Sequence, residues 1–186
     1  MPVTINGNGT VTGLTALPDS AMSSGSIIQV VQTFKTDAFS ASSSSYVDIT
    51  GMSVDITPSS NSNKILLEVL LNVGGANNMY GGVKLMRGST AVGISTAVSL
   101  SNQVNASFGV YTENGSNTDL KTGTFGFKFL DSPTTTSATT YKLQVYTRNG
   151  VEFNLNKANN NGNEPFIVGS TSSITVMEIA AWARSN

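Results

Sequence analysis

The side chains that most often carry catalysis near neutral pH are scarce in this chain. It contains no histidine and no cysteine, and only 11% of its 186 residues are charged. Ser95, within the segment Gly93 to Ala97, has the small neighbours of a nucleophile elbow, but activating a serine requires an adjacent base, normally histidine. A Ser-His-Asp triad is therefore excluded within this chain, and we predict that the protein is not an enzyme.

Acidic pairs remain as a route to hydrolysis, because glycosidases place two carboxylates across a sugar. Eleven Asp and Glu residues supply many pairs by number, but their separation in a β-structure does not follow from sequence, so no pair is singled out. Glu178 is the most unusual acid. Its neighbours in the last apolar segment are Val176, Met177 and Ile179. We expect it to be a partnered charge at a strand edge or in a contact between subunits.

Metal binding is restricted in the same way. Without histidine or cysteine only oxygen ligands remain, which favours calcium or magnesium over zinc or copper. The segment Asn154 to Glu164 is rich in amide oxygens but lacks the closely spaced acids of an EF-hand. We interpret it as a polar loop across the top of the fold, with a bound calcium ion as the alternative. No metal site and no cofactor is predicted.

Aromatic side chains could stack on sugar rings at an exposed surface. Tyr80 and Tyr111 adjoin polar or turn-rich sequence, and we predict both as surface-binding residues. Trp182 is a further candidate for stacking, but it lies near the end of an apolar segment, so burial against a neighbouring subunit is at least as good an expectation for it.

Charge and hydropathy exclude two further classes of partner. The net charge is −1, and the Lys and Arg residues are scattered rather than gathered into a stripe that could neutralise phosphates, so we expect no nucleic-acid binding. The run Ile65 to Leu67 ends at Glu68 and is far too short to span a bilayer, so no membrane insertion is expected. Met1 to Asn6 lacks the features of a secretory signal.

The elements that must position these residues repeat with a period of two. Met52, Val54 and Ile56 alternate with polar residues, and similar alternation follows in segments 125–129, 141–145 and 151–155, which is typical of β-strands. Segment 65–73 is apolar on both sides, which predicts a central strand between two layers. Turn signals recur at a spacing of roughly 8 to 12 residues. The fold class predicted is all-β, a jelly-roll-like antiparallel β-sandwich of about nine to eleven strands.

Two hairpins and a core follow from this pattern. Val83 to Val92 predicts one hairpin, and Tyr141 to Leu155 predicts another about Asn149-Gly150. The candidate core residues are Val54, Ile56, Leu67, Val69, Leu71, Phe127, Leu143 and Val145.

Residues 1–25 differ from the rest, with small residues and few apolar positions. We predict an extended N-terminal arm over 1–25 and a sandwich head over 26–186, because the arm has too little apolar surface for a core of its own. The candidate virion or subunit contacts, with Glu178 and Trp182, are Val3, Ile5, Val11, Leu14 and Leu17. Self-association would cover exposed sheet edges and would give the arm a surface to pack against, so we expect a homotrimer.

Several stretches together carry a family resemblance: 4–14, Gly25 to Gln32, Asn63 to Leu67, Phe129 to Pro133 and Ile174 to Ile179. This combination resembles small virion structural proteins of tailed bacteriophages, particularly those of marine phages and cyanophages, which are often described as tail-fibre-like. The resemblance covers nearly the whole chain, and its motifs are structural. It implies a homotrimer that attaches to the particle through its arm and presents a β-sandwich head.

From the resemblance and the arm-and-head layout we expect a short tail fibre whose head contacts the host surface, a glycan or a protein. The chain lacks the repetitive shaft of a long fibre, so a trimeric capsid decoration (cement) protein is the first alternative. A glycan-binding or glycan-degrading tailspike-like protein is the second. In each case the partners are other virion proteins of the tail or capsid, and the location is the phage particle, assembled in the host cytoplasm.

Overall fold

The computed structural model describes residues 4–5, 11–12, 22–97, 103–112, 121–159, 165 and 167–181. Within them the chain forms strands and a single turn of 3-10 helix, Arg148–Gly150. The strands are β1 (Thr4–Ile5), β2 (Val11–Thr12), β3 (Ile27–Lys35), β4 (Phe39–Ala41), β5 (Val47–Ile56), β6 (Lys64–Gly75), β7 (Tyr80–Arg87), β8 (Thr90–Val92), β9 (Phe108–Tyr111), β10 (Gly123–Asp131), β11 (Thr139–Thr147), β12 (Phe153–Leu155) and β13 (Ser172–Ile179). No helix among these residues is long and apolar enough to cross a membrane.

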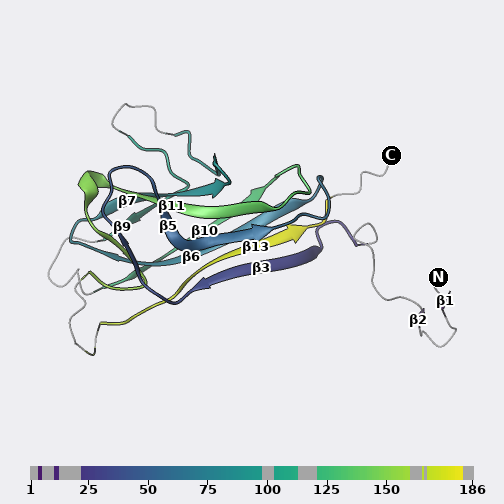
Figure 1. The fold of residues 1–186 in the computed structure, drawn as a ribbon, viewed down its shortest axis with the longest axis horizontal. Coiled ribbons are helices and arrows are strands. Elements are labelled where there is room, and N and C mark those ends of the chain that lie inside the picture. The colour runs from purple at the N-terminus through teal and green to yellow at the C-terminus, as the bar shows by residue number, and fades with distance from the viewer. Residues whose placement is uncertain are drawn as a thin grey trace.

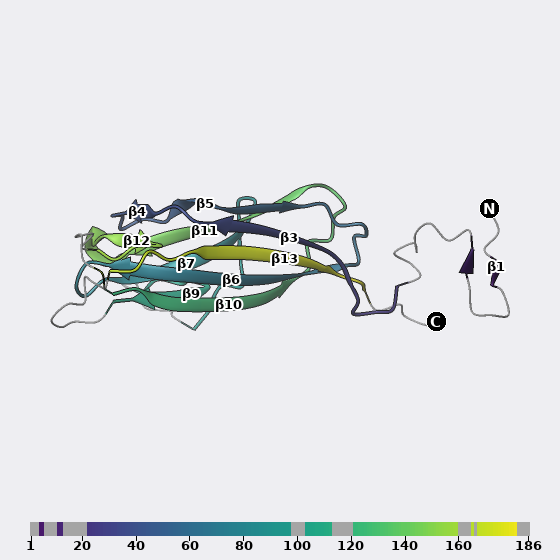
Figure 2. The same ribbon diagram turned by 90° about the horizontal axis from the view of Figure 1, so that it is seen from below.

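Two antiparallel sheets pack face to face (Figures 1 and 2). The β6 sheet has the order β3-β13-β6, with β10 on the other side of β6 and the short strands β12 and β4 continuing it. The β7 sheet has the order β5-β11-β7, with β8 and β9 both pairing with β7. Chain-distant strands are thus interleaved in each sheet, which is the strand arrangement of a jelly roll. The predicted fold class is confirmed.

The core lies between the sheets and consists of the alternate side chains that the period-two pattern selects. Seven of the eight predicted core residues are buried, and Phe127 is only partly buried and packs against the core. Phe127 lies on the edge strand β10, where its ring stacks on Phe108 of β9 with 5.4 Å between ring centroids. Aromatic side chains therefore close the sandwich at this edge, where the hydrogen-bonded ladder of β10 ends.

Polar side chains close the opposite edge. Gln29 of β3 donates a hydrogen bond from Nε2 to the backbone oxygen of Thr57 at 2.8 Å, and Thr33 donates from Oγ1 to the backbone oxygen of Ser53 at 2.6 Å. These bonds join an edge strand of the β6 sheet to an edge strand of the β7 sheet. They occupy backbone acceptors that an exposed strand edge would otherwise offer to another chain.

The first predicted hairpin is confirmed, since β7 and β8 pair with Leu85 opposite Val92. The second is wrong. Asn149 and Gly150 have the left-handed backbone of a tight hairpin turn, with φ of 56° and 64°, but β11 belongs to the β7 sheet and β12 to the β6 sheet. The turn therefore carries the chain from one layer to the other.

The prediction for segment 65–73 needs a correction as well. β6 is central within its own sheet, paired with β10 on one side and β13 on the other. Its inward side chains are buried, whereas its outward side chains are partly or largely exposed, Leu70 to 43%. The strand lies between neighbouring strands of one layer, and its outer face is at the surface.

The head has two distinct ends. β3 begins, and β13 finishes, at one end, where Ile27 pairs with Ile179 and Ile179 with Lys64. β6 runs from this arm-proximal end to the far end, where it finishes at Gly75 and β7 then begins at Tyr80. Figure 1 shows the start of β3 and the labels of β7 and β9 toward opposite ends of the sandwich.

Candidate functional site

Four of the five tyrosines lie on the outer face of the β7 sheet at its far end. Tyr80 of β7 and Tyr111 of β9 are register partners, and both are about half exposed, at 49% and 55%. Tyr146 of β11 lies opposite Gly82 of β7, and the ring of Tyr46 lies beside it with 5.7 Å between the two ring centroids. We call these four side chains the tyrosine face. The structure thus brings together the two tyrosines that the sequence predicted and adds two that it did not.

A hollow of about 620 Å³ opens on this face between Tyr80 and Tyr146. Gly82 and Gly109, which are register partners, both line it. Gly82 is required by space, because a Cβ there would lie 2.9 Å from both the Tyr46 hydroxyl and the Ala106 side chain. Gly109 faces open space, since a Cβ would have its nearest neighbour at 3.9 Å.

Tyr46 is fixed in place on this face. Its hydroxyl donates a hydrogen bond to the backbone oxygen of Asn105 at 2.9 Å, and the ammonium of Lys84 lies 3.8 Å from its ring centroid. Burial, with a smaller contribution from Tyr146, raises the pKa of Tyr46 to about 12. Tyr46 therefore stays protonated at neutral pH, and a cation over its ring adds to the stability of its position.

Polar groups border the hollow toward the end of the sandwich. Arg148 and Asn149, in the turn after β11, line the main hollow and also an adjacent one of about 420 Å³. Tyr80 lines both hollows as well. Tyr111 lines a third hollow, of about 290 Å³, together with Lys121 and Phe125.

This arrangement is suited to binding a ligand. Exposed tyrosine rings offer large apolar faces at low cost in side-chain entropy, and their hydroxyls offer hydrogen bonds at the rim. Gly109, which faces open space, lets a flat ligand approach the backbone closely. Arg148 supplies a guanidinium that donates in a fixed plane to carboxylate, sulfate or hydroxyl oxygens. Such a combination fits a sugar ring or a short extended polar segment.

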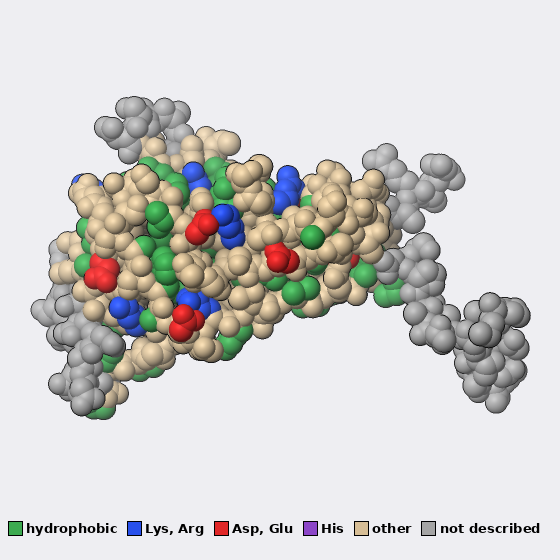
Figure 3. Space-filling view, viewed as in Figure 1, with side chains coloured by type: hydrophobic (Ala, Val, Ile, Leu, Met, Phe, Trp, Pro, Cys, Tyr) green, Lys and Arg blue, Asp and Glu red, His purple; other side chains and the backbone are tan. Residues whose placement is uncertain are grey.

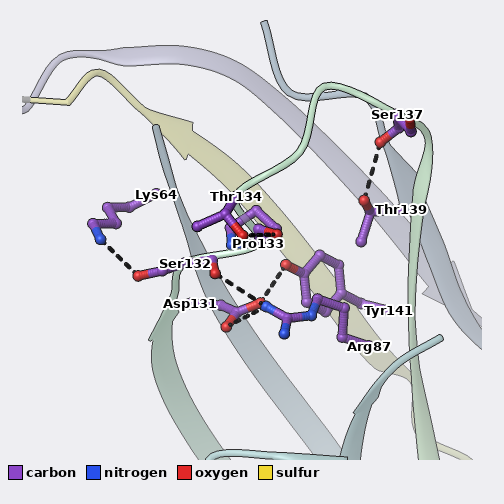
Figure 4. Close-up of polar contacts among 9 residues, drawn as sticks. All are labelled: Lys64, Arg87, Asp131, Ser132, Pro133, Thr134, Ser137, Thr139 and Tyr141. Atoms are coloured by element: carbon purple, nitrogen blue, oxygen red, sulfur yellow. Dashed lines mark hydrogen bonds and ion pairs between the residues drawn. The ribbon is translucent and has the colours of Figure 1, made fainter. Parts of the chain in front are cut away.

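The two buried acids, Asp131 and Glu178, lie away from the tyrosine face, in the interior at the arm-proximal end. Asp131 of β10 is buried, and Arg87 of β7 donates from Nη1 to both of its carboxylate oxygens, at 3.0 and 2.8 Å. Tyr141 of β11 donates its hydroxyl to the same carboxylate at 2.7 Å, and Figure 4 shows the three side chains converging. Burial, followed by the hydrogen bond to Asp131, raises the pKa of Tyr141. This cluster ties the two sheets together, and sequence analysis did not identify it.

Glu178 is the second buried acid, and its side chain is fully enclosed by its own protomer. Its Oε1 accepts hydrogen bonds from the backbone N–H and hydroxyl of Ser59, both at 2.7 Å, and from Nδ2 of Asn63 at 2.6 Å. Its Oε2 accepts from Gln29 at 2.5 Å. Burial alone would raise the pKa of Glu178, but these hydrogen bonds outweigh it and hold the pKa below its ordinary value. Of the two expectations for Glu178, the partnered charge agrees with the structure, because the carboxylate joins β3, β13 and the β5–β6 connection inside one chain. The alternative, a contact between subunits, is corrected by its full burial within that chain.

The amide-rich segment after β12 is used internally where the structure describes it. Asn156, with φ of 64°, donates from Nδ2 to the backbone oxygens of Lys35 and Asp37, and its Oδ1 accepts from Ser172 at 2.6 Å. Asn154 is fully buried and accepts from Ser40. Among the described residues no three acidic side chains gather in a way that could hold a metal ion. Residues 160–164 of the segment considered for calcium lie outside the described residues.

The remaining predicted contacts belong mainly to the arm. Ile5 and Val11 are register partners in the short ladder of β1 and β2. Val3, Leu14, Leu17 and Trp182 lie outside the described residues.

Surface charge is sparse on the face drawn in Figure 3. Basic and acidic side chains occur there singly or beside one another, and large uncharged areas separate them. Elsewhere in the structure, independently of this view, Lys142 and Asp48 form an ion pair at 2.7 Å. This face carries no single-sign field that would attract a polyanion such as nucleic acid.

The sequence matches no protein-family model and no curated protein. Among solved structures, the chain is similar to the VP2 subviral particle of infectious bursal disease virus, with 16% identity and a TM-score of 0.39 over 83% of this chain and 38% of that one. A structure of the Gx strain of the same virus gives 15% identity and a TM-score of 0.41, over 83% of this chain and 37% of that one. The chain thus spans less than half the length of these structures.

Proposed function

We propose that this chain is a non-enzymatic virion structural protein of a tailed bacteriophage, a short tail fibre. The N-terminal arm attaches it to other virion proteins, and the tyrosine face of the head contacts a glycan on the host surface. Self-association through the arms, as a homotrimer, belongs to the same proposal. The protein would be assembled in the host cytoplasm and would act on the phage particle.

The position of the tyrosine face carries this proposal. The arm joins the head next to Ile27, at the end where β13 also finishes, whereas Tyr80 and Tyr111 lie at the far end. An attachment protein needs its anchor and its binding surface at opposite ends. The half-exposed rings and Arg148 supply the stacking and hydrogen bonding that sugars require, and Gly109 leaves room for a ligand above the backbone. The sequence resemblance to tail-fibre-like virion proteins supports the same assignment.

Binding is tested with purified surface polysaccharide from a susceptible bacterial strain, measured per protomer by calorimetry. Tyr80→Ala combined with Tyr111→Ala should weaken binding by at least about tenfold, since stacking on one ring contributes of the order of 1 kcal/mol. Val168→Ala is the control, because Val168 is 64% exposed and lines none of the three hollows. Equal binding by the double variant and the parent would contradict the proposal. Shortened polysaccharide chains after incubation would contradict its non-enzymatic part.

Location is tested by imaging phage particles that carry a labelled copy of this chain. Label at the tail supports the short-fibre proposal, and phage lacking the protein should adsorb less. Label spread over the capsid shell, with weakened heads and normal adsorption after deletion, would replace the fibre with a capsid decoration protein.

A further inference from the structure

The outer face of the β6 sheet is an apolar surface at the opposite side of the sandwich from the tyrosine face. Val30 and Phe34 of β3 are 57% and 59% exposed, and Leu130 of β10 is 54% exposed. Leu70 of β6 projects from the same face. A cluster of large exposed apolar residues on one flat sheet face marks an interaction surface.

Register places the side chains of this face in three rows that cross the strands in the order β3, β13, β6 and β10. The apolar row consists of Val30, Met177, Leu66 and Leu130. The polar row consists of Gln32, Thr175, Glu68 and Lys128. The mixed row consists of Phe34, Ser173, Leu70 and Gly126.

The charges of the polar row cancel. Lys128 forms an ion pair with Glu68 at 2.9 Å, and both side chains are exposed. Their positions in the middle of the surface offer no net charge to a strongly acidic or basic partner. A partner that is itself neutral there, with polar groups opposite this pair, is the one that this face fits.

We propose that the occupant of this face is a second copy of the same chain, related by a two-fold axis that runs along the strands between β13 and β6. Such a rotation keeps each row opposite itself and exchanges β3 with β10 and β13 with β6. A two-fold contact of this kind requires one surface to be complementary to itself. The three rows meet this requirement.

Across the axis, Val30 faces Leu130 of the partner subunit, and Met177 faces Leu66 of the partner subunit, so apolar groups meet apolar groups. In the mixed row every large side chain faces a small one: Phe34 lies opposite Gly126 of the partner subunit, and Leu70 opposite Ser173 of the partner subunit. In the polar row Lys128 faces Gln32 of the partner subunit, and Glu68 faces Thr175 of the partner subunit. No like charges are opposed, and the faces of two sheets can pack about 10 Å apart with nearly aligned strands.

A charge-swap experiment can distinguish this contact between subunits from any contact within one chain. Val30 and Leu130 lie three strands apart in the same sheet, which is about 14 Å at the usual strand spacing. They are therefore too distant to form an ion pair within one chain if both are replaced by charged residues. Across the two-fold axis the same two positions are direct neighbours.

The experiment measures the mass of the full chain by sedimentation equilibrium over a range of concentrations. The expected mass is an even multiple of 19.4 kDa, a dimer or, where the arms also form trimers, a hexamer. Val30→Glu and Leu130→Lys should each weaken the two-fold association by at least about tenfold, because each places two unpaired charges in an apolar contact. The double variant V30E/L130K should restore it, because the two new charges are opposite and adjacent across the axis.

Val168→Glu is the control, since Val168 is 64% exposed but lies outside this face, and it should leave the mass unchanged. Circular dichroism and thermal unfolding confirm that each variant is folded. A chain that is monomeric at every concentration, or a trimer that neither single variant affects, would overturn the proposal. So would loss of association in both single variants without recovery in the double variant.

Discussion

Asp131 and Glu178 lie on one inward-facing row of the β6 sheet, on either side of Ile65, which is the register partner of both. Each carboxylate is buried, and each accepts hydrogen bonds from groups of its own chain. Neither lines any of the three hollows described above. The two acids therefore fasten the arm-proximal end of the sandwich, Asp131 between the sheets and Glu178 between three segments at the start of the head.

Replacing Glu178 with glutamine should destabilise the protein by about 1 to 3 kcal/mol at pH 7. The Oε1 atom can still accept from Ser59 and Asn63, but the new amide N–H₂ replaces the acceptor of the Gln29 hydrogen bond. Two donors then face each other in a buried position. Urea unfolding, followed by circular dichroism, measures the loss, and an unchanged midpoint would contradict the assigned role.

The same carboxylate makes a pH-dependent contribution to stability. Its folded-state pKa lies below the ordinary value of 4.5, so the folded state favours the ionised form. The stabilisation is complete above about pH 4.5 and is lost as the pH falls through the lower, folded-state pKa. The difference in stability between the parent and the Glu178→Gln variant should therefore be constant near neutral pH and decrease below pH 4.5. A difference that stays constant to pH 3 would argue against a depressed pKa.

Tyr141→Phe should cost about 1.5 to 3 kcal/mol of stability, because it removes a hydrogen bond to a buried carboxylate. Arg87 remains beside Asp131, so the cluster loses one donor and keeps its ion pair. Tyr80→Phe is the matched control: Tyr80 is half exposed, and loss of its hydroxyl should change stability by no more than about 0.5 kcal/mol. Equal effects of the two variants in thermal or urea unfolding would contradict the importance of the cluster.

The sequence predicts the strands and the jelly-roll-like class because alternation along a strand is a local property. Pairing is not local. The residues of β12 pair with β4 and β6, strands far away in sequence, and the left-handed turn at Asn149 and Gly150 suits a hairpin and a crossing between sheets equally well. The outward-facing Leu70 likewise could not be distinguished from a core residue, since both sides of β6 are apolar.

The candidate site residues also differ in whether local sequence or non-local strand pairing determines their positions. Tyr80 and Tyr111 could be predicted from their polar neighbours, but their direct pairing depends on the register of β7 and β9. Tyr146 carried a usable signal, because it alternates with the inward-facing Val145 and must therefore point outward. Tyr46 carried none, since its place beside Tyr146 on the tyrosine face depends on Lys84 and on the backbone of Asn105. Glu178 was singled out by its apolar neighbours, yet only the fold supplies its four hydrogen-bond donors.

Substitution by alanine should have different effects at the two glycines of the hollow: it should lower stability at Gly82 and weaken ligand binding at Gly109. In Gly82→Ala the new methyl group would lie 2.9 Å from the Tyr46 hydroxyl and from Ala106, so Tyr46 must move away from Asn105 and Lys84. We expect a loss of about 1 to 3 kcal/mol of stability, as for overpacking elsewhere. Ultraviolet titration should also detect a fall in the pKa of Tyr46 from about 12 toward 10, because the displaced ring is less buried.

Gly109→Ala places a methyl group in the floor of the same hollow with no neighbour closer than 3.9 Å. Stability should change by no more than about 0.5 kcal/mol, and the titration of Tyr46 should be unaffected. Binding of the polysaccharide should nevertheless weaken several-fold, because the methyl group occupies space that the ligand needs above the backbone. Unchanged binding by Gly109→Ala, with intact stability, would show that the ligand does not enter between Tyr80 and Tyr146 and would shift attention to the hollow beside Tyr111.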